Sequence, residues 1–205
     1  MAQAWIVLNC SLKGEATVPV EMKANKLNVF VLCTGRCGSV TFIEAARHIS
    51  NYSAGHETRT ALNGHARFAY PVRHIEADNR LSWLLGRLDA RYGDEAFYVH
   101  LQRDILDTAQ SFLKRKDRGI MRAYRADILM GADKRNDAQD LAFCIDYCQT
   151  VDANIRLFLK DKTRKMDFAL ESANADWVRF WDLIEAEGDL DKALACWDIK
   201  HNTSA

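Results

Sequence analysis

The chain has 205 residues, of which 48% are hydrophobic and 27% charged, with ten glycines and two prolines. This composition is that of one compact globular domain and argues against a disordered chain. The 28 basic and 28 acidic residues cancel, so the net charge offers no bulk attraction to nucleic acid or to an anionic membrane, and an anionic ligand needs a local site.

The first 25 residues carry little pattern. We predict an N-terminal arm over 1–25, either loose or forming an added strand, followed by a single domain over 26–205. The opening residues lack a basic n-region, so no signal peptide is expected, and no apolar run approaches the ~20 residues that a membrane span needs. The six cysteines lack the spacing of a zinc knuckle or a redox dithiol. We predict free thiols in a reducing compartment and a cytoplasmic protein.

Strand and helix patterns alternate from residue 28 onward. The run 28–33 is nearly all apolar and β-branched or aromatic, as in a strand buried on both faces of a parallel sheet. Further strands are predicted at 51–57, 70–75, 96–101 and 165–170, and helices at 39–49, 80–92, 105–116, 140–160, 175–187 and 190–197. This order predicts an α/β fold of three layers, a parallel sheet with helices on both faces. Ligands of such sheets bind at the carboxyl ends of the strands.

The turn after the first strand has the features of an anion-binding loop. Gly35 and Gly38 permit the backbone conformations of a tight turn, and the helix beyond offers unpaired N–H groups and a positive dipole end. Arg36 adds a planar guanidinium that suits phosphate or sulfate oxygens. Ser39, a predicted helix N-cap, and Thr41 add hydroxyls. A triphosphatase loop would need a lysine after the last glycine, and here Ser39 follows Gly38.

This turn resembles the 5′-phosphosulfate loop of sulfotransferases, whose usual form is Lys or Arg, Ser, Gly, Thr, then Thr or Ser. Arg36, Gly38 and Ser39 match that form in place, whereas Cys37 stands where Ser is usual and Val40 replaces the second hydroxyl. The resemblance implies a P-loop NTPase-like sulfotransferase fold and a donor, 3′-phosphoadenosine 5′-phosphosulfate (PAPS), bound without a metal ion. We call residues 34–41 the anion loop. Its expected donor-binding residues are Gly35, Arg36, Cys37, Gly38, Ser39, Val40 and Thr41.

A second match follows the strand predicted at 96–101. Arg103 lies just beyond that strand, and Ser111 lies eight residues further on, in the next predicted helix. In sulfotransferases an Arg and a Ser in this register hold the 3′-phosphate of the donor, a dianion that suits a bidentate guanidinium and a neutral hydroxyl. A late basic loop of the family closes over the same phosphate, which makes Lys200 a further candidate.

The segment 55–59, Gly-His-Glu-Thr-Arg, follows the second predicted strand. It resembles the Gly-Glu-Glu-Thr-Arg segment of tyrosylprotein sulfotransferases, which implies Glu57 as the catalytic base and Arg59 beside the transferring sulfuryl group. An acceptor hydroxyl must lose its proton as it attacks sulfur, and cations such as Arg36 and Arg59 stabilise the charge that grows on the bridging oxygen. His56 is the alternative base, because many cytosolic sulfotransferases use histidine.

Three classes of function are compatible with these motifs. The favoured one is sulfuryl transfer from PAPS to the hydroxyl or amine of a small-molecule, carbohydrate or peptide acceptor. The second is a P-loop kinase or triphosphatase, for which Asp104 is the candidate magnesium ligand. The third is a non-catalytic nucleotide-binding module, which the departure at Val40 favours. We expect no nucleic-acid partner, membrane partner or metal site. Neither the acceptor nor the oligomeric state is readable from the sequence.

Overall fold

The computed structural model describes residues 27–131 and 137–198. Five strands form one sheet in the order β2-β3-β1-β4-β5. They are β1 (Asn28–Leu32), β2 (Ser53–His56), β3 (His74–Ala77), β4 (Ala96–Gln102) and β5 (Lys165–Ala169). All four neighbouring pairs are parallel, so the carboxyl ends of the five strands meet at one edge of the sheet.

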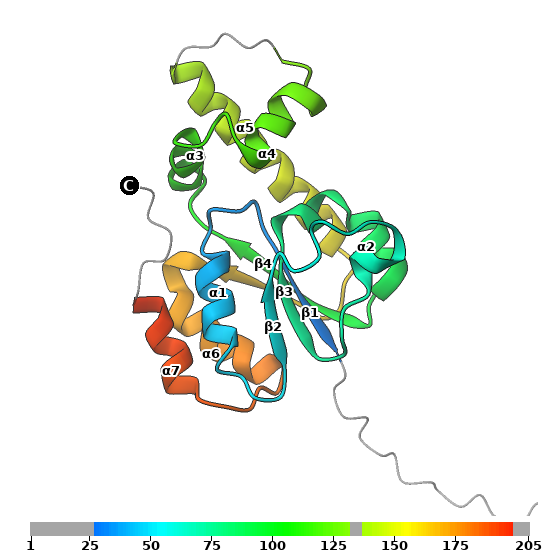
Figure 1. The fold of residues 1–205 in the computed structure, drawn as a ribbon. Coiled ribbons are helices and arrows are strands. Elements are labelled where there is room, and N and C mark those ends of the chain that lie inside the picture. Colours follow the sequence, from blue (N-terminus) through cyan, green and yellow to red (C-terminus); the bar gives the residue numbers. More distant parts are fainter. Residues whose placement is uncertain (1–26, 132–136, 199–205) are drawn as a thin grey trace, which may run out of the picture.

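Helices cover both faces of this sheet (Figure 1). They are α1 (Ser39–Ala46), α2 (Leu85–Tyr92), α3 (Ile105–Leu113), α4 (Gly119–Ala123), α5 (Asp137–Leu159), α6 (Ala173–Leu183) and α7 (Leu190–Ala195). Shorter helical segments are η1 (Gly64–Phe68), η2 (Asn79–Trp83), η4 (Leu170–Ser172), η5 (Cys196–Asp198) and the π-helical η3 (Tyr124–Ile128). Residues of α1, α6 and α7 pack on one face and residues of α2 to α5 on the other. The predicted three-layer α/β architecture is confirmed.

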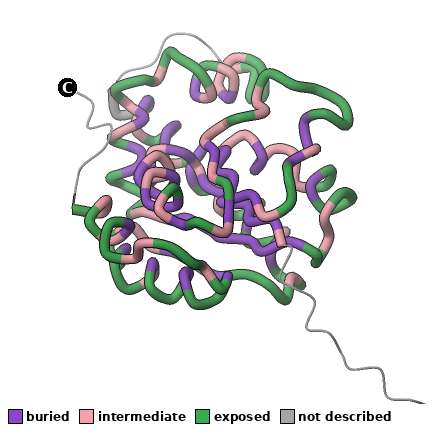
Figure 2. Tube along the Cα trace, turned by 60° about the horizontal axis from the view of Figure 1, so that its bottom comes forward, coloured by how far each residue is buried: buried purple, intermediate pink, exposed green. Residues whose placement is uncertain are grey.

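The central strand β1 divides the core into two halves. Val29 and Val31 point to the side of α1 and α6, whereas Phe30 and Leu32 point to the side of α5, as the alternation of a strand requires. All four are completely buried, and burial of such a side chain stabilises the fold by about 1.5–3 kcal/mol. Figure 2 shows the buried residues gathered at the centre of the molecule. The sheet that carries the candidate site at its edge is therefore packed against buried apolar residues on both faces.

The prediction of a single helix at 80–92 was wrong. The segment begins as the 3₁₀ helix η2, and α2 starts only at Leu85, after Leu84 leaves helical geometry with φ −122° and ψ 24°. The Asp78 side chain caps η2 by accepting a hydrogen bond from the Arg80 N–H, and the Ser82 hydroxyl donates to the Cys33 carbonyl at 3.1 Å. The tighter first segment is therefore fixed to the turn that follows β1.

The observed bounds of other elements also differ from the predicted ones. The strand predicted at 70–75 begins only at His74, because Tyr70 is directed into the core against Arg67 and Arg73 has a positive φ of 56°. The loop predicted at 58–69 contains η1. The predicted arm at 1–25 lies outside the described residues. The five described cysteines are free thiols. No helix in the described part of the chain is both long and apolar enough to cross a membrane.

Candidate functional site

The anion loop has a strained backbone at the carboxyl edge of the sheet. Gly35, Arg36 and Gly38 have φ angles of 86°, 61° and 94°. Glycine adopts such left-handed conformations freely, whereas an L-residue is destabilised by about 1–2 kcal/mol. Arg36 is one of the few non-glycine residues in this region of φ. Strain of this kind persists where surrounding contacts hold it and is typical of ligand sites.

The helix that follows presents an anion-binding end. Its first hydrogen bond joins the Phe42 N–H to the Gly38 carbonyl at 2.9 Å, so the amides of 39–41 precede the helical ladder and have no acceptor within the helix. The predicted cap at Ser39 was wrong. Gly38 is the N-cap, and the Ser39 hydroxyl lies 3.1 Å from Nε2 of His56. Amides at the positive end of a helix dipole suit phosphate or sulfate.

Residues from distant segments hold the anion loop from behind. The Thr34 carbonyl accepts hydrogen bonds from the Tyr147 hydroxyl at 2.8 Å and from Nδ2 of Asn79 at 3.4 Å. A Cβ atom on Gly35 would lie 2.8 Å from that same Asn79 nitrogen. These supports were not predicted, because Tyr147 and Asn79 belong to α5 and η2 and carry no local motif.

The two cysteines around the anion loop are core residues. Cys33 and Cys37 are 0% and 1% exposed. A hydrogen bond from Cys33 lowers the pKa of the Cys37 thiol, and the same contact, followed by burial, raises the pKa of Cys33. Because the Cys37 side chain lies in the core, only its backbone is left for a ligand. Thr41 is also buried, at 6% exposure, and Val40 is half-buried.

Arg103 contacts Arg36 in the anion loop, and the charge of Arg115 acts on the same guanidinium; we call Arg36, Arg103 and Arg115 the arginine cluster. Nε of Arg36 donates to the Ser111 hydroxyl at 3.0 Å, and Nη1 of Arg103 donates to the Arg36 carbonyl at 3.4 Å. Burial lowers the pKa of Arg36, and the charges of Arg115 and Arg103 lower it further. Like charges repel one another, and a bound anion relieves the repulsion.

The structure thus brings the predicted pair Arg103 and Ser111 against the predicted loop residue Arg36. Arg115, whose charge lowers the pKa of Arg36, was not among the predicted site residues. Its one available signal was its place four residues after Ser111, the spacing at which side chains on a helical path become neighbours. Lys200, the other residue predicted for this phosphate, lies outside the described residues.

The predicted base lies in a tight turn after β2, residues 56–60, which we call the base turn. Glu57 has a φ of 53°, and its N–H donates to the Ala77 carbonyl at 3.0 Å. Oε2 of Glu57 forms an ion pair with Nη1 of Arg80 at 2.7 Å, and both side chains are about a third to two fifths exposed. His56 is the base-turn residue that reaches the anion loop, through Ser39.

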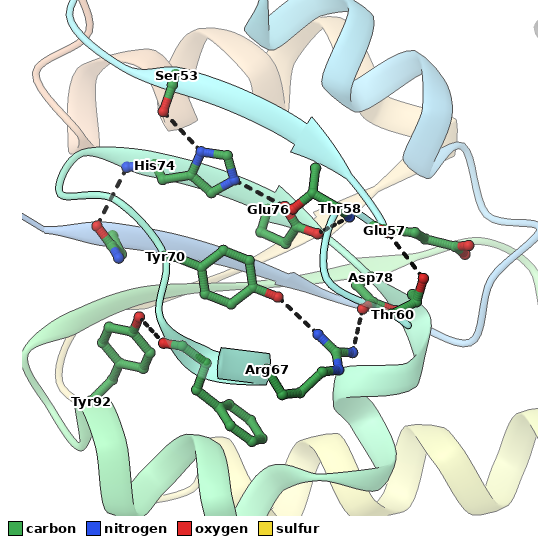
Figure 3. Close-up of polar contacts among 12 residues, drawn as sticks. Ser53, Glu57, Thr58, Thr60, Arg67, Tyr70, His74, Glu76, Asp78 and Tyr92 are labelled. Atoms are coloured by element: carbon green, nitrogen blue, oxygen red, sulfur yellow. Dashed lines mark hydrogen bonds and ion pairs between the residues drawn. The ribbon is translucent and has the colours of Figure 1, made fainter. Parts of the chain in front are cut away.

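Arg59 contacts η1 and Tyr70. Its Nη1 donates to the Ala66 carbonyl at 2.9 Å, and its guanidinium lies over the Tyr70 ring, 5.2 Å from the centroid. No hydrogen bond or ion pair within 27–131 or 137–198 joins Arg59 to the anion loop. Figure 3 shows Tyr70 held in turn by the buried pair of Arg67 and Asp78.

Gly38 offers a direct test of the loop geometry. Alanine at Gly38 is expected to lower the free energy of unfolding by more than the about 1–2 kcal/mol that a left-handed φ alone costs, because the new Cβ would also lie 2.9 Å from Cδ1 of Leu170. Urea denaturation measures this change. Gly119→Ala is the matched control, since Gly119 also has a positive φ, 53°, but no atom within 4 Å of the added Cβ. An equal loss in both variants would show that the Leu170 contact adds nothing.

No protein-family model and no curated protein matches the sequence. Among solved structures, the fold is similar to that of mouse sulfotransferase SULT7A1 complexed with PAP, with a TM-score of 0.51 and 15% sequence identity. The alignment covers 87% of this chain and 61% of the mouse chain, so the chain spans about three fifths of the length of that enzyme. The likeness shows that the five-stranded parallel sheet and its helices form a sulfotransferase-like fold.

Proposed function

We propose that this chain binds PAPS and transfers its sulfuryl group to a hydroxyl or amine of a small-molecule, carbohydrate or peptide acceptor. The observation that carries the proposal is the meeting of three elements at one sheet edge. The anion loop contacts the arginine cluster through Arg36 and Ser111, and it contacts the base turn through Ser39 and His56. The similarity to a sulfotransferase complexed with PAP supports the same assignment.

The donor has two anionic ends, and the site has two matching groups. In the proposal the amides of 39–41, with Arg36, hold the 5′-phosphosulfate. Arg103 and Ser111 hold the 3′-phosphate, and Arg115 adds charge at that end. The positive charge that activates the donor then comes from guanidinium groups and helix amides.

The transfer is an in-line displacement at sulfur. The acceptor oxygen forms a bond to sulfur, the bond from sulfur to the 5′-phosphate oxygen breaks, and 3′-phosphoadenosine 5′-phosphate (PAP) leaves. Glu57 accepts the proton of the acceptor hydroxyl. Its Oε2 is paired with Arg80, which orients the carboxylate and leaves the lone pairs of Oε1 for the acceptor. A base oriented by a third group is a recurring arrangement in catalytic sites.

His56 is the second candidate for the base, and one contact favours it. Its imidazole lies 3.1 Å from the Ser39 hydroxyl, at the end of α1 where the sulfuryl group would be held. When Glu57 is the base, the same contact gives His56 another task, which is to fix the Ser39 hydroxyl toward the donor.

The kinase or triphosphatase alternative is less compatible with the geometry. Asp104, its candidate magnesium ligand, caps α3 instead, because Oδ1 accepts a hydrogen bond from the Asp107 N–H at 2.9 Å. The Asp104 N–H donates to Glu171 at 2.8 Å. The anion loop also has no lysine to reach a nucleotide triphosphate.

Nucleotide binding tests the proposal most directly. PAP is expected to raise the melting temperature of the protein without magnesium, because arginines and amides hold its phosphates. A ligand at a hundred times its dissociation constant stabilises the native state by about 2.7 kcal/mol, which thermal-shift measurements detect. Stabilisation by ATP with magnesium, and none by PAP, would overturn the assignment. PAP binding without sulfuryl transfer to any acceptor would identify a binding module.

A further inference from the structure

A buried carboxylate lies directly beneath the base turn (Figure 3). Glu76, in the middle of β3, is 0% exposed. Its Oε1 accepts a hydrogen bond from the Thr58 N–H at 2.7 Å, and its Oε2 accepts one from the Thr58 hydroxyl at 2.8 Å. A buried charge destabilises a fold unless it is well hydrogen-bonded. Bonds to an ionised acceptor are the stronger kind, so Glu76 holds Thr58 at two points.

The Glu76 carboxylate also contacts residues of the neighbouring strands through His74. Oε2 of Glu76 lies 2.9 Å from Nε2 of His74, and Nδ1 of His74 lies 2.8 Å from the Ser53 hydroxyl. When that hydroxyl donates to Nδ1, Nε2 carries the ring proton and donates to Glu76. The His74 backbone N–H donates to the Asn28 side chain at 3.4 Å. The network therefore joins β1, β2 and β3 to the base turn.

The base turn needs such support because of the conformation of Glu57. Its φ of 53° costs an L-residue about 1–2 kcal/mol. The hydroxyl of Thr60 donates to the Glu57 carbonyl at 3.1 Å, and the Thr58 bonds fix the next peptide. On the N-terminal side of Glu57, a Cβ atom added to Gly55 would lie 2.3 Å from Cγ2 of Thr58. The backbone on both sides of Glu57 is therefore closely packed.

We propose that Glu76 is a positioning residue for sulfuryl transfer. Through its two hydrogen bonds to Thr58 it holds Glu57 in the left-handed conformation and aims the Glu57 carboxylate at the acceptor. This inference rests on the proposed function, in which Glu57 takes the proton. Glu76 itself acts only through Thr58, from a fully buried position in β3.

Thr58→Val removes the hydroxyl bond to Glu76 and keeps the amide bond, and valine matches threonine in shape at this exposed position. We expect kcat to fall about 10- to 100-fold, since a displacement of about 1 Å at a reacting group has this effect. The donor KM and the thermal shift with PAP are expected to stay unchanged. Thr58→Ser keeps the hydroxyl and is expected to restore most of kcat.

The same substitution in a Glu57→Gln protein distinguishes a positioning role from a general loss of structure. In a Glu57→Gln protein, Thr58→Val is expected to cause no further loss, because the group that it displaces is already inactive. An equal additional loss in that background would overturn the proposal, as would a wild-type kcat for both Thr58→Val and Glu76→Gln.

Hydrogen exchange gives a readout that does not depend on turnover. Glu76→Gln keeps the shape of the side chain but removes its charge, and we expect faster exchange of the Thr58 amide with little change elsewhere in the sheet. Exchange at the wild-type rate would show that Glu76 does not hold the turn. If the wild-type protein fails to bind PAP or transfer a sulfuryl group, the proposed function fails, while this comparison still decides whether the turn depends on Glu76.

Discussion

Replacement of Glu57 by glutamine is expected to lower kcat for sulfuryl transfer by about 10²–10⁴-fold, the usual contribution of a general base. Glutamine keeps the length and shape of the side chain but does not take the proton of the acceptor. Donor binding is expected to stay nearly intact, because the anion loop and the arginine cluster are unchanged. Steady-state kinetics and the thermal shift with PAP measure the two effects separately.

His56→Gln is the paired control for this variant. With Glu57 as the base, the histidine variant is expected to lose less, because it removes only the contact at the Ser39 hydroxyl. The reverse pattern, in which the histidine variant is inactive and the Glu57 variant retains activity, would assign the base to His56. That outcome would change the mechanism and leave the donor site as proposed.

The elements that the sequence predicted best are those with a local cause. The apolar run predicted at 28–33 matches β1, Asn28–Leu32, whose five residues are all buried, because a strand covered on both faces needs apolar side chains on both. Gly35 and Gly38 were predicted to form a tight turn because glycine has a freer backbone, and both have a positive φ. Features of this kind are encoded within a few consecutive residues.

The features that the sequence did not predict depend on distant partners. Ser39 was expected to cap α1, but its hydroxyl is hydrogen-bonded to the imidazole of His56 in β2. The guanidinium of Arg59 contacts a carbonyl of η1 and the Tyr70 ring, and its place beside the sulfuryl group stays a prediction. The support that Tyr147 gives to the loop crosses 113 positions of sequence. Side-chain direction in such cases is decided by packing, which no local pattern records.

The arginine cluster combines the two kinds of information. The register of Arg103 and Ser111 was visible in the sequence, whereas their contact with Arg36 is visible only in the fold. Because the guanidinium of Arg36 donates to Ser111, a side chain of the anion loop reaches the residue expected to hold the 3′-phosphate. The two ends of the donor would therefore be bound by one connected set of side chains.

Arg103→Ala is expected to weaken PAP binding by about 1.5–3 kcal/mol, the range for hydrogen bonds to a charged group, and to lower turnover at saturating donor far less. The reason is that the 3′-phosphate is remote from the reacting sulfur. Calorimetry with PAP measures the loss. Adenosine 5′-phosphate, which lacks the 3′-phosphate, is expected to bind the variant and the wild-type protein equally.

The control for Arg103 is its own ion-pair partner. Nη2 of Arg103 lies 3.4 Å from Oδ2 of Asp107, and a surface pair of this kind contributes at most about 1 kcal/mol. Asp107→Asn removes the pair and keeps the guanidinium, so PAP is expected to bind this variant as tightly as the wild-type protein or more tightly. If Arg103→Ala left PAP binding unchanged, Arg103 would have a structural role only, in its contacts with Asp107 and the Arg36 carbonyl, and its assignment to the 3′-phosphate would be wrong.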